Sequence, residues 1–372
     1  MKKLDGDPKK VDAEDGGIPA LRRQIDAIDD QILALINRRL LTARDIGRSK
    51  QRTGTTVVDR RRETEIYQRL GSLNNGPLKT GALYRIFGNT IAAGRGIQVS
   101  RRPQKAPPVY AVFGDPVGHS LSPVMHNSAL RHSGLDGVYL AFRVKDIAAA
   151  VSGIRGLGIQ GVSITIPHKV SVMEYLDKVD ATAAKIGAVN TVVNRQGRLQ
   201  GYNSDCTGAV KAVHEKTPIK GRHVAIVGAG GAARAIGFGI IQEGGRITII
   251  NRSSQNGEKL AKDLNCDFIP LAEATRLPYD IVINTTPVGM TPHDDCSPLK
   301  SELLTADTLV MDMVYNPLKT RLIRDAQKAG CPTVEGLSMF VHQGAVQFEL
   351  WTGQKAPVDV MRRAVLDELS SQ

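Results

Sequence analysis

Residues 223–236 read HVAIVGAGGAARAI, and the rest of the chain is organised around this stretch. An apolar run that fits a buried strand leads into a glycine turn and then into the start of a helix. Gly228 allows the tight turn, Gly230 lets the backbone approach a pyrophosphate, and Ala233 keeps the helix close to the strand. The helix amides would then point at the anion. The pattern predicts a dinucleotide-binding unit, with a purely structural turn as the alternative.

The residues that follow indicate which dinucleotide is bound. A second apolar run, residues 246–250, stands at the distance expected for the next parallel strand. It ends in Asn251 and Arg252, where an NAD-binding chain carries an acidic residue for the free ribose 2′-hydroxyl. An arginine suits a 2′-phosphate instead, because its charge is permanent. The sequence therefore favours NADP as the cofactor.

Length and composition set outer limits. The 372 residues allow two or three domains, each able to bury a core. Hydrophobic residues make up 41%, and no apolar run approaches the length of a membrane span, so no membrane partner is expected. Residues 1–17 are charged and lack the apolar core of a secretion signal, which predicts a cytoplasmic protein with a flexible arm. The scattered cysteines indicate neither disulfides nor zinc: Cys206, Cys266, Cys296 and Cys331.

The net charge of +12 is concentrated in the first part of the chain. Residues 1–105 hold 22 Lys and Arg against 12 Asp and Glu, whereas the remainder holds 27 against 25. Such a segment needs nucleic acid, an acidic surface or a small internal anion as its partner. Nucleic acid is the least favoured of these, because the arginines fall partly in an apolar stripe. Aromatic residues for base stacking are also few.

This first part predicts three helices, over residues 18–50, 58–70 and 78–98. Apolar residues recur along the first helix at alternating three- and four-residue spacing, which is typical of a helix that buries one stripe. The members of that stripe are Leu21, Ile25, Ile28, Ile32, Leu35, Thr42 and Ile46.

Two cations, Arg39 and Lys50, interrupt the stripe and lie within about 20° of each other around the helix. Burying an unpaired charge costs several kcal/mol, so these cations need anions. The anions are either those of a bound ligand or carboxylates of neighbouring helices, such as Asp59 and Glu63. The sequence leaves both possibilities open.

Over residues 18–98 this part resembles the all-helical chorismate mutase family. In that family two chains interlock, and each pocket takes residues from both, so the resemblance implies a homodimer. The resemblance is carried by Leu21, Arg22, Arg39, residues 47–50, Val58, Asp59, Arg62, Glu63 and Gln98.

The resemblance implies that Arg39, together with Arg22 of the partner chain, binds the substrate carboxylates, and that Arg62 assists. Helix geometry agrees with a donated Arg22, because 17 residues place it roughly 100° around the helix from Arg39.

Two further pairs complete the implied pocket. Lys50 and Gln98 would bond the ether oxygen of the substrate, and Asp59 and Glu63 would hold the side of its ring hydroxyl. The sequence departs from the family at Gly94, where a serine is common. This departure and Gly96, a second glycine inside the same helix, motivate an alternative, in which the helical part only regulates or dimerises the rest of the chain.

Residues 99–108 contain three prolines and no periodic apolar pattern, which predicts a solvated linker. Beyond it, short apolar runs alternate with helical periodicity, so we expect an α/β fold with parallel strands and crossover helices. The expected strands include residues 109–113, 138–142, 161–166, 281–284 and 309–313, and the expected helices include 124–133, 147–157, 336–351 and 358–369.

Lys169 follows the expected strand 161–166, at the edge where open α/β sheets place their ligands. The ordinary alternative is a solvated surface lysine. Asn190 and Asp205 add polar groups at bends shortly before the nucleotide-binding stretch. Their presence favours a functional Lys169.

From residue 109 almost to the C-terminus, the chain resembles the shikimate dehydrogenase family. It departs at Ser163, where the family commonly has the longer Asn. The family's motifs occur in order: GDPVGHSLSP (114–123), TIPHK (165–169), AVNT (188–191), NSD (203–205), GAGGAA (228–233), NRS (251–253), NTTPVGM (284–290) and DMVY (312–315).

This resemblance implies NADP-dependent interconversion of 3-dehydroshikimate and shikimate, with quinate as an alternative substrate. Lys169 and Asp205 would act as paired acid and base at the carbonyl, as an ammonium beside a carboxylate can. Ser120 and Ser122 would bind the substrate carboxylate. Further substrate contacts would come from Thr165, Asn190, Tyr315 and Gln343. Cofactor contacts would come from Gly228, Gly230, Gly231, Ala232, Ala233, Asn251, Arg252, Ser253, Thr285, Met290 and Met313.

Taken together, the two resemblances imply a bifunctional enzyme with a helical mutase domain over residues 18–98. They further imply a substrate lobe over 109–205, a Rossmann cofactor lobe over 206–334, and C-terminal helices over 335–372 that return to the substrate lobe. Met290 would lie against the nicotinamide or, alternatively, fill the core. The histidines are not spaced as metal ligands, so no metal is expected.

Overall fold

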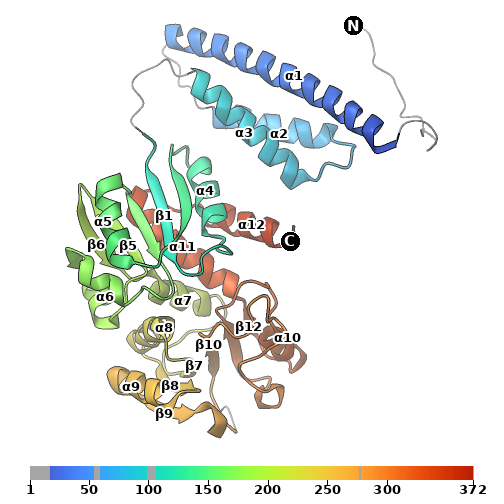
Figure 1. Cartoon of the computed structure of the whole chain (residues 1–372). Helices are drawn as coiled ribbons and strands as arrows, with labels where there is room; N and C mark the ends of the chain where they lie inside the picture. Colours follow the sequence, from blue (N-terminus) through green and yellow to red (C-terminus); the bar gives the residue numbers. More distant parts are fainter. Residues whose placement is uncertain (1–16, 54–58, 99–105, 276–277, 372) are drawn as a thin grey trace. The chain divides into compact units, whose positions relative to one another are not determined.

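The chain divides into two compact parts, a helical unit within residues 1–105 and an α/β unit within 106–372. The expected arm over residues 1–17 and the linker over 99–108 lie almost wholly outside the described residues. The computed structural model describes residues 17–53, 59–98, 106–275 and 278–371 (Figure 1).

The described part of the helical unit consists of α1 (Gly17–Thr53), α2 (Arg60–Leu73) and α3 (Thr80–Gln98). With 37 residues, α1 is about 55 Å long. The carboxylate of Asp59 caps α2 by accepting a hydrogen bond from the Arg62 amide at 3.0 Å. α3 packs on α1 at Gly94, where an added Cβ would lie 3.4 Å from the Cβ of Ala43.

The apolar stripe of α1 is exposed within this chain. α3 meets α1 around Leu40 and Ala43, beyond the end of the stripe's first five residues. The predicted burial of those five side chains is therefore not achieved by α2 and α3. Their exposed fractions are 60% for Leu21, 57% for Ile25, 54% for Ile28, 47% for Ile32 and 63% for Leu35.

The α/β unit contains two six-stranded sheets among its described residues. Alternate residues of β1 (Val109–Gly114) enter two cores. Tyr110 and Val112 pack on the side of α4 (Ser122–His132), and Ala111 and Phe113 pack on the side of α5 (Ile147–Leu157). In order across the first sheet the strands are β2 (Val138–Arg143), β1 (Val109–Gly114), β3 (Gly161–Ile164), β5 (Thr191–Arg195), β6 (Arg198–Tyr202) and β4 (Lys178–Val179). The helices of this lobe include α4 (Ser122–His132), α5 (Ile147–Leu157) and α6 (Ala181–Ile186).

The first sheet is mixed: its three strands predicted from sequence are parallel, as expected, and one further strand, β5, runs in the opposite direction. β2, β1 and β3 are parallel, but β5 runs antiparallel to both β3 and β6. β5 and β6 form a hairpin through Gln196 and Gly197, whose φ angles of 56° and 88° suit a type I′ turn. Gln-Gly is not among the strong hairpin dipeptides, so the sequence analysis did not predict this hairpin.

The second sheet is parallel throughout, and its strand order is that of the Rossmann fold, with the switch point between β7 and β10. In order the strands are β9 (Asp267–Pro270), β8 (Arg246–Asn251), β7 (His223–Val227), β10 (Ile281–Asn284), β11 (Leu309–Asp312) and β12 (Thr333–Val334). Its helices are α8 (Gly231–Gln242), α9 (Ser254–Leu264) and α10 (Arg321–Lys328).

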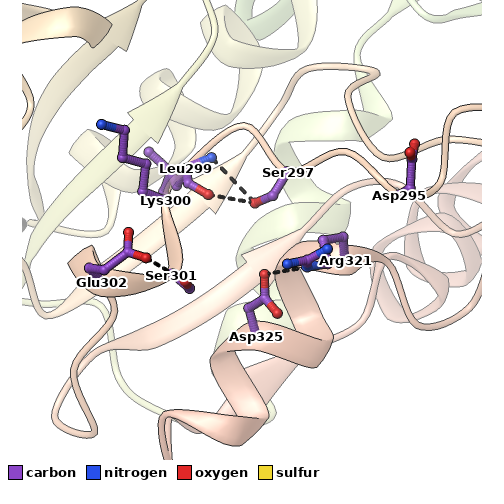
Figure 2. A pocket seen from close by; sticks show the side chains of 8 residues that line it. All are labelled: Asp295, Ser297, Leu299, Lys300, Ser301, Glu302, Arg321 and Asp325. Carbon is purple, nitrogen blue, oxygen red and sulfur yellow. Dashed lines mark hydrogen bonds and ion pairs between the residues drawn. The ribbon is translucent and has the colours of Figure 1, made fainter.

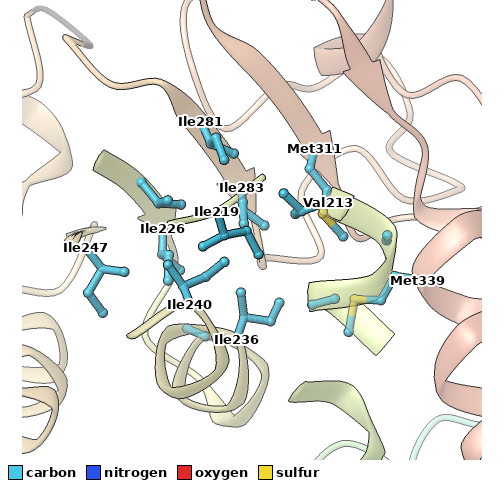
Figure 3. Close-up of a cluster of buried hydrophobic side chains, with 14 of the residues drawn as sticks. Val213, Ile219, Ile226, Ile236, Ile240, Ile247, Ile281, Ile283, Met311 and Met339 are labelled. Atoms are coloured by element: carbon cyan, nitrogen blue, oxygen red, sulfur yellow. The ribbon is translucent and has the colours of Figure 1, made fainter. Parts of the chain in front are cut away.

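Two helices that are far apart in the sequence, α7 (Ser204–His214) and α11 (Gly336–Thr352), pack against each other and connect the two lobes. Figure 3 shows Met339 of α11 and Val213 of α7 in the core of the second sheet, near Ile236 and Ile240 of α8. Further along α11, Val341 joins the core of the first sheet. The last helix, α12 (Val358–Leu369), packs on α4.

Candidate active sites

The glycine turn after β7 has the geometry of a phosphate cradle. Gly228 has φ +120°, and a Cβ there would collide with the side chain of Thr285. Gly230 is the N-cap of α8, and no heavy atom lies within 4 Å of a Cβ built on it, so the space beside this backbone is open. Thr285 donates a hydrogen bond to the Val227 carbonyl at 2.7 Å, which joins β7 to β10 at the switch point. These residues fit a dinucleotide pyrophosphate.

The residues after β8 fit the 2′-phosphate of NADP. Asn251 ends the strand, Arg252 is exposed directly beyond it, and Ser253 caps α9. The other predicted cofactor contacts differ in burial. Met290 is 47% exposed, so it does not fill the core, whereas Met313 packs partly against the core of the second sheet.

Lys169 and Asp205 form an ion pair with Nζ 2.5 Å from Oδ2. Only 16% of the Lys169 side chain and 7% of the Asp205 side chain are exposed, so the alternative of a solvated lysine is excluded. The carbonyl of Lys169 accepts a hydrogen bond from the Val189 amide at 2.7 Å. A Cβ added to Gly231 would lie 3.7 Å from the Cβ of Lys169. The structure therefore places the charged pair beside the cofactor turn.

Two more predicted residues, Asn190 and Gln343, meet next to this pair. Asn190 is 2% exposed, and its Nδ2 donates to Ser204 Oγ at 2.9 Å, while its Oδ1 accepts from the Ser204 amide at 2.7 Å. Ser204 Oγ lies 3.5 Å from Gln343 Oε1. Because Ser204 directly precedes Asp205 at the start of α7, these bonds also fix the position of the carboxylate.

The loop after β1 brings the remaining predicted substrate residues together. Ser120 Oγ accepts a hydrogen bond from the Ser122 amide at 3.3 Å. Burial raises the pKa of Tyr315, and hydrogen bonds with the Leu121 backbone and with Ser120 partly offset that rise. A Cβ on Gly114 would collide with the side chain of Thr165, so this glycine lets the end of β1 approach the loop after β3.

The sequence analysis did not predict a buried set of hydrogen-bonded side chains formed by Tyr139, Ser163 and Gln347. The Tyr139 hydroxyl donates to Ser163 Oγ at 2.6 Å, and Ser163 Oγ donates to Gln347 Oε1 at 2.8 Å. Gln347 lies one helical turn beyond Gln343 on the same helix face, and this spacing is the sequence signal that could have indicated a second polar residue near the site. His126 stacks on Tyr139 at 4.5 Å, and burial lowers the pKa of this histidine to about 3, so it is neutral.

In the helical unit, Arg39 is partly buried and reaches α3. Its Nη1 donates to the Thr90 carbonyl at 3.1 Å, so its partner here is backbone and not one of the carboxylates considered from sequence. A Cβ on Gly94 would lie 3.6 Å from Arg39 Nη1, which is an ordinary van der Waals distance. Lys50, also partly buried, lies near the end of α1.

Glu63 binds Arg95 of α3 through both of its carboxylate oxygens. Arg95 Nε lies 2.9 Å from Oε1 and Nη2 lies 2.5 Å from Oε2, and the two side chains are 29% (Arg95) and 19% (Glu63) exposed. The Asp59 carboxylate already accepts the N-cap hydrogen bond of α2. Arg62 is exposed and pairs with Glu65 at 3.2 Å. Arg95 was not predicted as part of this site.

Two predicted mutase residues lie away from this group. Arg22 is exposed near the start of α1, about 25 Å from Arg39 along the helix axis, so the two cannot line one pocket in the same chain. Gln98 is the last residue of α3, but its side chain lies outside the described residues.

Other features of the described residues indicate no ligand class. The described ranges hold no group of three metal-ligating side chains placed to bind an ion. Among the helices described, none is long and apolar enough to cross a membrane. Figure 2 shows a shallow depression that carries charges of both signs and is lined by Asp295, Ser297, Leu299, Lys300, Ser301, Glu302, Arg321 and Asp325.

Comparison with known proteins identifies the α/β unit. Residues 112–192 match the shikimate dehydrogenase substrate binding domain, and residues 336–366 match the shikimate 5'-dehydrogenase C-terminal domain. Shikimate dehydrogenase (NADP(+)) of Methanothermobacter thermautotrophicus is 44% identical over 269 residues, which are 69% of this chain and 95% of the relative. The chain belongs to the shikimate dehydrogenase family. The protein of the same name from Symbiobacterium thermophilum is 46% identical over 280 residues, which are 71% of this chain and 95% of that protein.

Solved structures of the shikimate dehydrogenase family have the same fold. A crystal structure of shikimate dehydrogenase in complex with NADP+ has a TM-score of 0.68 at 40% identity, covering 71% of this chain and 96% of that one. The Thermus thermophilus enzyme in complex with NADP(H) and shikimate has a TM-score of 0.66 at 36% identity, covering 70% of this chain and 99% of that one.

The helical unit matches a different family. Residues 21–99 match the family described as chorismate mutase type II. Both resemblances stated from sequence are therefore confirmed.

Proposed function

We infer that this chain is a bifunctional enzyme, an NADP-dependent shikimate dehydrogenase joined to a chorismate mutase. The observation that carries the dehydrogenase activity is the Lys169–Asp205 pair at 2.5 Å beside Gly231 of the cofactor turn, in a chain of this family. The mutase activity is supported by the family match over residues 21–99 and by the partly buried cation of Arg39.

In the dehydrogenase reaction, NADP bound at the glycine turn supplies the hydride chemistry. Lys169 is placed to donate a proton to the carbonyl oxygen of 3-dehydroshikimate as that oxygen becomes an alkoxide. In the opposite direction the neutral amine of Lys169 takes the proton of the shikimate hydroxyl and becomes the ammonium again. Asp205 holds the ammonium in position and stabilises its charge. Because both side chains are largely buried, water competes little for these proton transfers.

Substrate orientation is assigned to polar groups around this pair. In the proposal Ser120 and Ser122 bind the carboxylate of shikimate, and Thr165, Asn190 and Gln343 bind its hydroxyls, with Tyr315 nearby. The hydrogen bonds between Asn190 and Ser204 support this arrangement, because they hold the amide still beside Asp205 before substrate binds.

The mutase reaction is a Claisen rearrangement, which needs no proton transfer. It needs a dianion folded into a chair and stabilisation of negative charge on the ether oxygen. The proposal assigns the carboxylates to Arg39 and to Arg22 of the partner chain, with Arg62 assisting, and assigns the ether oxygen to Lys50 and Gln98. All of these groups are cations or amides, the types this chemistry requires.

The alternative of a purely regulatory helical unit rested on Gly94 and Gly96. An added Cβ on Gly96 would meet no other atom within 4 Å, so this glycine serves no close packing. An added Cβ on Gly94 would meet Ala43 at 3.4 Å and Arg39 at 3.6 Å, so that glycine leaves the arginine in place without opening a large void. Asp59 is the N-cap residue of α2 and Glu63 lies in its first turn. Both are proposed to hold the side of the substrate that carries the ring hydroxyl. These contacts favour a catalytic helical unit.

We propose that the chain forms a homodimer through α1. Five apolar residues at alternating three- and four-residue spacing, from Leu21 to Leu35, are 47–63% exposed in the single chain. Two helices bury such a seam by packing against each other. A second chain would also bring its own Arg22 to the pocket of Arg39, which one chain cannot do because about 25 Å of helix separates them.

Ile28→Lys is expected to convert the dimer to a monomer and to abolish chorismate turnover, because it places a charge in the centre of the seam. Light scattering measures the mass, and shikimate oxidation should remain at the parental rate. Asp30→Lys is the matched control, since Asp30 lies about 200° around the helix from Ile28. A monomeric parent protein, or equal dissociation by both substitutions, would contradict the proposed interface.

We also propose a cytoplasmic location and no nucleic-acid partner. All four cysteines are free, as is usual in a reducing compartment. The basic charge of the helical unit has an explanation in the anionic substrate proposed for it, because Arg22, Arg39, Lys50 and Arg62 belong to the proposed site.

The proposed function is tested with the purified full-length chain in two assays. One follows NADPH formation from shikimate and NADP, and the other follows conversion of chorismate to prephenate. We expect both activities, and slower oxidation with NAD, because Arg252 then has no 2′-phosphate to bind. Lack of NADPH formation would exclude the dehydrogenase, and lack of prephenate would exclude the mutase and restore the regulatory alternative.

A further inference from the structure

Gln347 connects parts of the substrate lobe that are far apart in sequence. It lies on α11 with 2% of its surface exposed. Its Oε1 accepts from Ser163 Oγ at 2.8 Å, and its Nε2 donates to the Asn190 carbonyl at 3.3 Å and to Thr191 Oγ1 at 3.1 Å. One side chain therefore bridges β3 and the start of β5.

The bridge continues to both sides of the proposed substrate site. Toward β2, Ser163 Oγ accepts from the Tyr139 hydroxyl at 2.6 Å, and this hydroxyl is also hydrogen-bonded to Ser122. Ser122 is one of the two residues proposed for the substrate carboxylate. A continuous set of hydrogen bonds thus runs from the carboxylate side through Ser163 to Gln347.

On the other side, Thr191 Oγ1 donates to Asn190 Oδ1 at 2.7 Å, and Asn190 bonds Ser204 at the start of α7. Asn190 is proposed to bind a substrate hydroxyl, and Ser204 directly precedes Asp205. The same set of hydrogen bonds therefore ends beside the charged pair.

Both N–H groups of the Gln347 amide donate within the protein, and its oxygen already accepts from Ser163, so this buried amide has no N–H left to donate to a ligand. Ser163 stands where the family commonly has the longer Asn, and its hydroxyl is held between Tyr139 and Gln347.

We propose that Gln347 is a positioning residue that determines shikimate binding by holding Asn190 and the Ser163–Tyr139–Ser122 chain in place. This inference rests on the proposed dehydrogenase activity and adds a residue that touches neither substrate nor cofactor. Loss of the amide lets Asn190 and Ser122 reorient, so the hydroxyls and the carboxylate of the substrate lose pre-formed partners.

The test uses the full-length enzyme with Gln347→Met, which keeps the volume of the side chain but removes its hydrogen bonds. We expect the KM for shikimate to rise by about ten- to a hundredfold. The KM for NADP and the kcat should change by less than about threefold, as for a residue that affects substrate binding alone. A parental KM for shikimate in this variant would overturn the inference while leaving the proposed function intact. A parent enzyme without shikimate oxidation would overturn both.

Phe348→Leu is the matched control for a general loss of stability. Phe348 neighbours Gln347 on α11, is 1% exposed, and packs only within the core of the first sheet. It should lower the melting temperature without raising the KM for shikimate, and an equal rise in both variants would overturn the inference. Should Gln347→Met not fold, Tyr139→Phe removes a single hydroxyl from the same chain of bonds. Its KM for shikimate should rise about three- to tenfold, and a parental value there would overturn the inference as well.

Discussion

Replacement of Lys169 by methionine is expected to lower the kcat for NADP-dependent shikimate oxidation by about 10²- to 10⁴-fold. Methionine retains most of the apolar stem but has no group that can take the hydroxyl proton. It also leaves Asp205, 7% exposed, without the ammonium that now lies 2.5 Å away. Initial rates of NADPH formation at saturating shikimate and NADP measure the effect.

Two controls separate chemistry from folding in that experiment. Lys185→Met makes the same change in the last turn of α6, where the lysine is exposed, and should retain the parental kcat. Chorismate turnover, which belongs to the helical unit, should persist in both variants. If Lys169→Met keeps more than about a tenth of the parental kcat, the lysine is not the proton-transferring group.

Arg39→Ala is expected to lower kcat/KM for chorismate by about 10²- to 10³-fold, or about 3–4 kcal/mol of transition-state stabilisation. The arginine is partly buried at a position of α1 that otherwise continues an apolar stripe. One of its nitrogens is held by the Thr90 carbonyl at 3.1 Å, which orients the remaining N–H groups. A fixed cation of this kind binds a carboxylate without further ordering. Single-turnover loss of chorismate measures the effect.

The neighbouring Arg38→Ala is the control for charge, because Arg38 is exposed about 100° around the helix from Arg39. Arg38→Ala should keep parental chorismate turnover, and shikimate oxidation should be unchanged in both variants. Parental turnover in Arg39→Ala would mean that the arginine only stabilises α1 against α3. In that outcome the carboxylates of chorismate need a different cation.

Much of the fold could be predicted from sequence wherever the pattern is local. The predicted helices over residues 147–157 and 358–369 and the strand over 281–284 are confirmed with the same limits. The glycine turn was equally readable, because Gly228, Gly230 and Ala233 each meet a steric requirement of one short segment. The pairing of Lys169 with Asp205 came from family resemblance, and the structure adds its distance and burial.

Predictions failed where a residue's state depends on distant partners. The hairpin of β5 and β6 carries no strong turn dipeptide, so it was not predicted, and its antiparallel pairing is seen only in the structure. The stripe of α1 looked buried because helical spacing reports an apolar face but not what covers that face. The same applies to Glu63, whose partner Arg95 lies 32 residues away on another helix.

The sequence by itself determined the two families, the order of the helices and strands in the cofactor lobe, the preference for NADP, and the residue types that carry each reaction. All of these depend on short segments whose backbone geometry or charge constrains their composition. Only the tertiary structure decided that Gln347 joins Ser163 and Asn190, which stand 184 and 157 residues earlier in the chain. A buried amide must satisfy its hydrogen bonds with whichever groups the fold brings to it, and no local pattern in the sequence records that choice.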